Sequence, residues 1–123
     1  MKYIRLFADD AGASHFADVQ ITFTDNDYTP SAPPLGLSPM SIATQFGFMS
    51  APANWESDWH PSSARNFFIV TSGEWEVTAS DGETRRFGPH SLLLVEDTTG
   101  KGHKSRVVSD STAAIIELSD RLR

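Results

Sequence analysis

Two histidines, His60 and His103, are the residues of this chain whose type and spacing are best suited to chemistry. Short apolar runs separated by turns connect them, so a closed sheet would bring the two side chains together. A pair of imidazoles can bind a divalent metal ion or transfer a proton near neutral pH. The alternative is that both are neutral, hydrogen-bonded pocket residues. The other histidines, His15 and His90, are interpreted as solvated or capping residues.

The composition narrows the classes of function. The chain has 123 residues and a net charge of -6, so nucleic acid is not expected as a partner. It contains no cysteine, which excludes disulfides, thiolate metal ligands and cysteine nucleophiles. The N-terminal stretch MKYIRLFADDAG is charged and lacks a long apolar segment, so we expect no membrane association and a cytoplasmic location. The length favours a single domain over residues 1–123.

Short apolar runs bounded by Gly, Pro, Asp and Ser predict an all-β chain. The pair Asp81-Gly82 is a strong hairpin signal and predicts a type I′ turn. Gly73 is expected where the chain reverses between two strands, because glycine readily adopts positive φ. The predicted strands are Lys2 to Phe7, Phe16 to Phe23, Ser41 to Met49, Asn66 to Ser72, Glu74 to Ala79, Glu83 to Phe87, Ser91 to Val95, His103 to Val108 and Ala113 to Leu118.

The segment from Trp59 to His103 resembles the two motifs that mark cupins, a superfamily of small β-barrels that often hold a metal ion. The first motif contains a histidine, a second histidine two residues later, a glutamate, and a glycine before the next strand. With that glycine placed on Gly73, His60 takes the first histidine position. Ser62 and Asn66 then take the positions of the second histidine and the glutamate.

The second cupin motif follows in the same order. It is matched by Gly88, the strand Ser91 to Val95, a loop from Asp97 to Gly102, and His103. The resemblance implies a single-domain cupin fold, the double-stranded β-helix or jelly-roll barrel.

The resemblance also implies an interior site for one divalent metal ion, Fe, Mn, Ni, Cu or Zn, with His60 and His103 as ligands. Ser62 and Asn66 stand in place of a histidine and a carboxylate, so the ion would lose one strong donor and one negative charge. The second hypothesis needs no metal. In it, His60 and His103 are catalytic groups that transfer a proton.

Strand alternation predicts the walls of a ligand pocket. If Asn66 faces the interior, Phe68 faces it too. Phe46 and Phe48 share one face of an earlier strand and are expected to join this interior. Together with Ser62, these four residues are the predicted ligand-binding residues. The alternative is a plain barrel core filled by its own side chains.

The loop before His103 contains features that could support a site. Gly100 and Gly102 are expected to let the backbone approach a bound group, or simply to form a turn. A carboxylate beside His103, from Glu96 or Asp97, would determine which ring nitrogen carries the proton.

Two further segments are expected at the surface of the barrel. The stretch from Asp25 to Pro39 contains four prolines and is interpreted as a loop that wraps the barrel or caps one mouth, with a plain linker as the alternative. Trp55, Trp59 and Trp75 are expected to pack between sheets or against a second subunit. Small cupins commonly pair, so the resemblance implies a homodimer, which would also cover exposed strand edges.

Two classes of function follow. The first is an enzyme, of the isomerase, lyase, cyclase or oxygenase type, that acts on a small, partly apolar organic substrate inside the barrel. Its chemistry would depend on His60 and His103. The second is a non-catalytic module that binds or senses a small ligand without a metal.

Overall fold

The structure is a computed structural model that describes residues 1–119, so the last four residues of the predicted single domain lie outside the described part. Its strands are β1 (Lys2–Ala8), β2 (Ser14–Gln20), β3 (Thr24–Asn26), β4 (Leu35–Leu37), β5 (Ala43–Ala51), β6 (Asn66–Ala79), β7 (Thr84–Phe87), β8 (Leu92–Glu96) and β9 (His103–Leu118). The all-β prediction is confirmed. Within the described residues there is no helix that could span a membrane.

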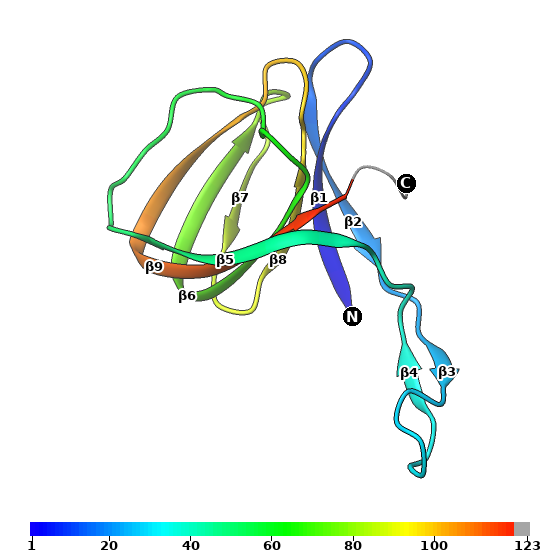
Figure 1. The fold of residues 1–123 in the computed structure, drawn as a ribbon. Helices are drawn as coiled ribbons and strands as arrows, with labels where there is room; N and C mark the ends of the chain where they lie inside the picture. Colours follow the sequence, from blue (N-terminus) through cyan, green and yellow to red (C-terminus); the bar gives the residue numbers. More distant parts are fainter. Residues whose placement is uncertain (120–123) are drawn as a thin grey trace.

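Seven strands form one sheet in the order β2-β1-β8-β6-β9-β5, with β7 paired to β6. The longest strands, β6 and β9, run antiparallel from Asn66 opposite Glu117 to Ala79 opposite His103. Their register is broken between Val70 and Trp75, and such bulges bend strands and increase their twist. Figure 1 shows both strands curving so that the sheet wraps round on itself.

Gly73 does not reverse the chain, and this prediction is wrong. It lies inside β6 with a φ of 73°, and a Cβ atom there would lie 2.2 Å from the carbonyl oxygen of Asp110 on β9. Glycine is therefore required at a bulge where two strands approach closely. The bulge shifts the alternation: Val70 is buried before it, whereas Trp75 and Val77 are buried after it.

Two other boundaries differ from the predictions. β9 is one continuous strand. Among the named strands its first part pairs with β6, and its later part lies between β6 and β5. The hairpin at Asp81-Gly82 exists, between β6 and β7. Gly82 has a φ of 99°, but Asp81 is not among the described residues with positive φ, so the turn is not of type I′.

The proline-rich segment neither wraps the barrel nor caps its mouth, which corrects that interpretation. Residues 21–42, called the arm here, leave the barrel after β2 and project away from it (Figure 1). β3 and β4 pair with each other in a separate two-stranded sheet. Pro30, Pro33 and Pro34 lie in the connection between them, where their missing N–H groups interrupt no ladder.

The core lies on the concave side of the main sheet, where buried side chains from most strands meet. Because apolar burial is the main stabilising term in folding, this cluster holds the strands around the interior. Its members are Leu6, Phe16, Ala51, Val70, Trp75, Val77, Ala79, Phe87, Leu93 and Val107.

His15 joins two loops at the surface. Its Nε2 atom lies 2.6 Å from Oδ2 of Asp9, and its Nδ1 atom lies 2.9 Å from Oδ2 of Asp81. The hydrogen bond with Asp9, followed by that with Asp81, raises the pKa of His15 above its usual 6.5. The same bond with His15 is the main reason why the pKa of Asp9 is held below 3.8.

The raised pKa of His15 and the lowered pKa of Asp9 predict a contribution to stability that depends on pH. The His15 contribution is complete below pH 6.5 and is lost as pH rises through the raised pKa, whereas the Asp9 contribution is lost as pH falls below 3.8. We expect His15→Gln to lower the melting temperature most between these two pH values and least above neutral pH. Thermal melts across pH check this, with His90→Asn as the control. An equal effect of His15→Gln at every pH would contradict it.

Candidate functional site

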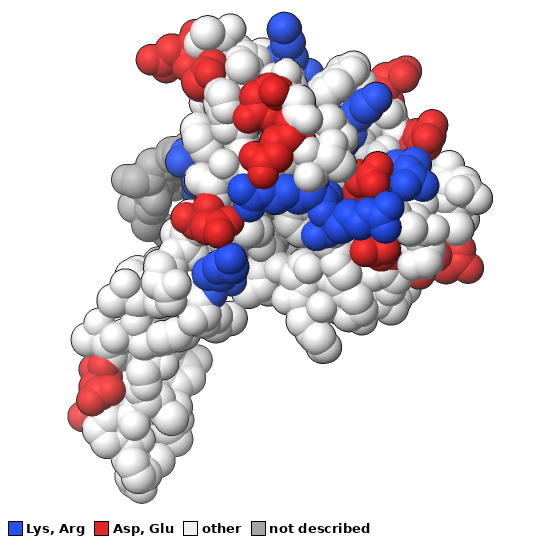
Figure 2. All heavy atoms as spheres, turned by 180° about the vertical axis from the view of Figure 1, so that it is seen from behind, with Lys and Arg blue, Asp and Glu red and all other residues white. Residues whose placement is uncertain are grey.

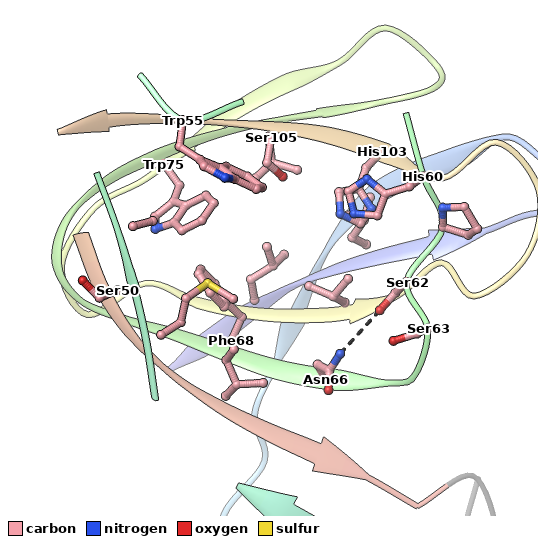
Figure 3. Close-up of a pocket in the computed structure, with 18 of the residues that line it drawn as sticks. Ser50, Trp55, His60, Ser62, Ser63, Asn66, Phe68, Trp75, His103 and Ser105 are labelled. Atoms are coloured by element: carbon pink, nitrogen blue, oxygen red, sulfur yellow. Dashed lines mark hydrogen bonds between the residues drawn. The ribbon is translucent and has the colours of Figure 1, made fainter. Parts of the chain in front are cut away.

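A cavity of about 640 Å³ opens inside the barrel. Its lining is mostly apolar, and no Lys, Arg, Asp or Glu of the described chain contributes to it. Figure 3 shows Trp55 and Trp75 gathered at one end and His60, His103 and Asn66 at the other. The remaining lining residues are Leu6, Met49, Ser50, Ala51, Pro52, Pro61, Ser62, Ser63, Phe68, Val77, Leu93, Val95, Ser105 and Ile115.

The structure brings His60 and His103 together, as the sequence predicts. They form an isolated antiparallel bridge in which each backbone N–H donates to the other residue's carbonyl oxygen, at 3.0 Å. Their ring centroids are 4.8 Å apart. Gly102 permits this approach, because a Cβ atom there would lie 2.0 Å from the carbonyl oxygen of His60. Gly102 therefore brings the backbone close to the chain itself rather than to a bound group.

Hydrogen bonds determine the tautomer of both rings. Nδ1 of His103 lies 2.6 Å from Oδ2 of Asp97, and Nδ1 of His60 lies 2.9 Å from the carbonyl oxygen of Asp58. Because a carboxylate and a carbonyl oxygen can only accept, each Nδ1 carries the proton. The neutral rings therefore present unprotonated Nε2 atoms, to which no described side chain is hydrogen-bonded.

The two imidazoles differ in burial. His103 is only 7% exposed and Asp97 is fully buried, whereas His60 is exposed at the rim of the cavity. Oδ1 of Asp97 has no hydrogen-bond partner in the described part of the chain. A positive charge that forms on His103 would thus lie against a buried carboxylate, the arrangement that stabilises an imidazolium during proton transfer. His60 remains able to exchange protons with solvent.

Ser62 and Asn66 line the same end of the cavity, at the positions predicted for ligand-binding residues. The Ser62 hydroxyl donates to the carbonyl oxygen of Ala64 at 2.6 Å. The Asn66 amide donates to Ser62 Oγ at 3.4 Å and to the Ala64 carbonyl at 3.3 Å. These bonds direct the amide nitrogen of Asn66 toward the loop, which leaves its oxygen as an acceptor for a ligand.

Aromatic side chains form the end of the cavity opposite the two histidines. Phe68 lines the cavity as predicted, and its ring centroid lies 5.3 Å from that of Trp75 in an edge-to-face contact. Trp55 contacts Trp75 in a similar way at 5.9 Å. Neither indole was predicted from the sequence to line the pocket. The alternation of charged and apolar residues after Gly73 was the available signal for Trp75, but the bulge changes which residues of β6 face inward.

Ser111 on β9 fixes the orientation of Trp75. The buried indole N–H donates to Ser111 Oγ at 2.7 Å, and this hydroxyl donates to the carbonyl oxygen of Ser72 at 2.7 Å. We expect Ser111→Ala to lower the free energy of unfolding by about 1–3 kcal/mol, because the buried indole donor loses its acceptor. Urea denaturation followed by tryptophan fluorescence measures this. Ser109→Ala, at an exposed serine of the same strand, is the control, and equal stability of Ser111→Ala and the wild type would refute the assignment.

The prediction that Phe46 and Phe48 line the interior is wrong. They do share one face of β5, but that face is the outer one, and the two side chains are 76% and 80% exposed. Met49 and Ala51, of the opposite parity, line the cavity instead. Alternation alone shows which residues share a face but does not show which face is inside.

Solved structures of similar fold were found, although no protein-family model and no curated protein sequence matches the chain. The Cnp3 cupin domain of Schizosaccharomyces pombe is similar over 98% of this chain and 89% of that one, with 17% identity and a TM-score of 0.53. The chain has a cupin fold. The jelly-roll prediction is thereby confirmed.

Two bacterial structures are similar in fold to this chain. The protein SPY1581 of Streptococcus pyogenes, of unknown function, is 18% identical, with a TM-score of 0.52 over 62% of this chain and 64% of that protein. The protein NMB1881 of Neisseria meningitidis is 20% identical, with a TM-score of 0.50 over 67% of this chain and 84% of that protein. At these identities the likeness concerns the fold alone, so the function of this chain has to be argued from its site.

A divalent ion in this cavity would have to be held by the Nε2 atoms of His60 and His103. Catalytic sites of this kind usually supply three protein ligands. Residues 1–119 contain no group of three or more His, Cys, Asp or Glu that could hold a metal ion. The Asp97 carboxylate is directed at Nδ1 of His103 and is fully buried. The residues present therefore do not fit a resident divalent ion.

Proposed function

We propose that this cupin is an enzyme that binds a small, uncharged and partly apolar organic molecule and transfers a proton on it without a metal. The observation that supports this most strongly is the pair of unprotonated Nε2 atoms at one end of an aromatic-walled cavity. The ring centroids of the two imidazoles lie 4.8 Å apart, so both rings can reach one small molecule. One ring can therefore serve as base while the other serves as acid.

The walls support a particular class of ligand. The volume of about 640 Å³ lies within the range of small-molecule sites. Edge-to-face contacts among Trp55, Trp75 and Phe68 favour a flat ring or cyclic hydrocarbon. Because no charged side chain of the described part lines the cavity, a neutral carbonyl or hydroxyl compound fits better than a multiply charged metabolite.

The proposed proton transfer uses residues in distinct roles. Nε2 of His103 removes a proton from a carbon or oxygen of the substrate, and the resulting positive charge is balanced by Asp97. His60, protonated by solvent at the rim, then gives its Nε2 proton to another atom of the substrate. Breaking one C–H bond and forming another gives an isomerisation, and loss of a leaving group instead gives a lyase reaction. Asn66 positions the substrate through its free amide oxygen.

Deuterium exchange tests this proposal without knowledge of the natural substrate. Cyclic and aryl ketones with exchangeable α-hydrogens, such as 2-indanone, are incubated with the protein in D₂O, and incorporation is followed by NMR. We expect His103→Ala to lower the catalysed exchange by about 10²–10⁴-fold, the usual contribution of a general base. Trp59→Phe is the matched control, because Trp59 does not line the cavity. Equal exchange with wild type and His103→Ala would contradict the proposal.

The non-catalytic alternative and the metal alternative give different results. Saturable quenching of tryptophan fluorescence by these ketones with no exchange for any of them would favour a ligand-binding or sensing module. Stoichiometric Fe, Mn, Ni, Cu or Zn in protein purified without chelator, lost in both His60→Ala and His103→Ala, would favour a metal enzyme. Either outcome would replace the metal-free proton transfer proposed here.

A further inference from the structure

We propose that the hydroxyl group of Ser105 determines which substrate this cavity takes, and that this substrate is a ring ketone with a hydroxyl group on the ring. The inference rests on the proposed function, in which His60 and His103 form the reacting end of the cavity. Ser105 lines the same cavity. Figure 3 shows its side chain on the wall between His103 and the indole of Trp55.

Strand geometry directs the Ser105 side chain into the cavity. Ser105 follows His103 by two residues on β9, so both side chains lie on the same face of the strand. The intervening Lys104 is exposed, and the next residue, Arg106, pairs with Glu76 on the outer face at 3.6 Å. Two residues of a strand span roughly 6.6 Å, so a single substituted ring can reach both His103 and Ser105.

Hydrogen bonds on one side and strand pairing on the other hold the backbone of Ser105 in place. The Ser57 N–H donates to the carbonyl oxygen of Ser105 at 2.9 Å, and the Ser105 N–H donates to Ser57 Oγ at 3.0 Å. On its other side, Ser105 lies opposite Val77 of β6. A side chain on a backbone held from both sides is positioned before the ligand binds, which lowers the entropic cost of binding.

The Ser105 hydroxyl is available to a ligand. Its backbone makes all the hydrogen bonds that Ser105 has within residues 1–119. The Ser62 hydroxyl, in contrast, donates to the Ala64 carbonyl, and the other two serines of the lining, Ser50 and Ser63, are exposed to solvent. Ser105 is only partly exposed. A ring that fills the cavity would displace water from its hydroxyl, and an unpaired hydroxyl costs free energy. A ligand with an oxygen at this point therefore binds better than one with only carbon there.

The second oxygen of the ligand is expected to be neutral. Charged side chains of both signs lie on the outer surface of the barrel, as Figure 2 shows for one face. None of the described Lys, Arg, Asp or Glu residues lines the cavity, so a carboxylate or phosphate beside Ser105 would have no counter-ion. A hydroxyl group can donate and accept, as the serine hydroxyl also can. A ring hydroxyl therefore matches Ser105, with the carbonyl group of the ligand at the end formed by His60 and His103.

Binding of two ring ketones of nearly equal shape tests this inference. 5-Hydroxy-2-indanone has a hydroxyl group where 5-methyl-2-indanone has a methyl group, and quenching of tryptophan fluorescence gives the dissociation constant of each. We expect Ser105→Ala and Ser105→Val to lower the preference for the hydroxy compound by about 3–10-fold relative to the wild type, the usual net contribution of one hydrogen bond. Ser105→Thr has the shape of the valine variant but keeps the hydroxyl group, so it should retain the preference.

Ser109→Ala is the control, because Ser109 is an exposed serine of β9 outside the cavity, and it should show the wild-type preference. Thermal melts check that the Ser105 variants remain folded. The same preference in the wild type and Ser105→Val would overturn the assignment of Ser105. Absence of binding of either compound to the wild type would overturn it too.

Deuterium exchange into the two ketones separates failure of this inference from failure of the proposed function. Exchange by the wild type with a preference that does not depend on Ser105 would contradict only the role of Ser105. A preference that depends on Ser105, with no exchange into either ketone, would support the role of Ser105 and contradict the proton transfer.

Discussion

Replacing Asp97 by asparagine is expected to lower proton transfer in the cavity by about 10²–10⁴-fold, because this carboxylate holds His103 in the tautomer with a free Nε2. If the new amide group donates to Nδ1 of His103, the ring proton moves to Nε2 and the base is lost. If the amide oxygen accepts instead, the NH₂ group is buried at a site where Oδ1 of Asp97 has no partner among the described residues. In both cases no negative charge remains to balance an imidazolium. Deuterium exchange into 2-indanone measures the loss.

Asp58→Asn is the matched control for this experiment. Asp58 binds Nδ1 of His60 through its backbone carbonyl oxygen, which the substitution leaves in place. We therefore expect Asp58→Asn to retain exchange close to that of the wild type. If Asp97→Asn kept the wild-type rate, or if both variants lost it equally, the role given to the Asp97 side chain would be wrong.

Gly102→Ala is expected to lower the free energy of unfolding by about 2–5 kcal/mol. Part of this loss comes from the strain of an alanine in the left-handed region, and part comes from displacement of the packed backbone. Gly102 has a φ of 74°, and a Cβ atom there would lie within 2.3 Å of three backbone atoms of His60 and Pro61. The segment carrying His60 would have to move, which would break its bridge to His103. Urea denaturation measures the stability, and ring NMR signals of His60 report the displacement.

Gly82→Ala separates the two causes of this loss. Gly82 also has a positive φ, of 99°, but a Cβ atom there would have nothing within 4 Å. This variant should lose only the conformational part, about 1–2 kcal/mol, and should leave the signals of His60 unchanged. Equal losses in the two variants would show that Gly102 is not required for the approach of the histidines.

Local pattern was sufficient to predict the strands and one end of the site. Short runs of β-branched and aromatic residues correctly indicated an all-β chain. The resemblance to the cupin motifs correctly predicted that His60 and His103 meet, because it places both residues at the interior of one barrel. Alternation correctly placed Asn66 and Phe68 on one inward face. The inferences about strands and alternation need only regular strands, whereas the meeting of the two histidines depends on the barrel that the resemblance implies.

The missed residues depend on features that break regularity. The bulge at Gly73 changes the inward parity of β6, so Trp75 faces the cavity although alternation from Asn66 would place it outside. Alternation correctly predicted that Phe46 and Phe48 share one face of β5. It could not predict whether that face is directed inward or outward, because this is set by the packing of β5 on β9.

Tertiary placement decided between two neighbouring carboxylates. The sequence offered both Glu96 and Asp97 as partners of His103. In the structure Glu96 forms ion pairs with Arg5 and Arg65, whereas Asp97 contacts His103. The choice depends on β1 lying beside β8, a pairing between strands far apart in the sequence. No local pattern contains that information.

Long-range ¹H–¹⁵N correlation of the histidine rings tests the central claim most directly. It distinguishes a protonated from an unprotonated ring nitrogen, and His15→Gln and His90→Asn serve to assign the other two histidines. At a pH where the rings are neutral, His60 and His103 should each show a proton on Nδ1 and none on Nε2, and both Nε2 signals should shift when 2-indanone is added. A proton on Nε2 of either ring would contradict the account. So would Nε2 signals whose chemical shifts do not change with any ligand bound in the cavity.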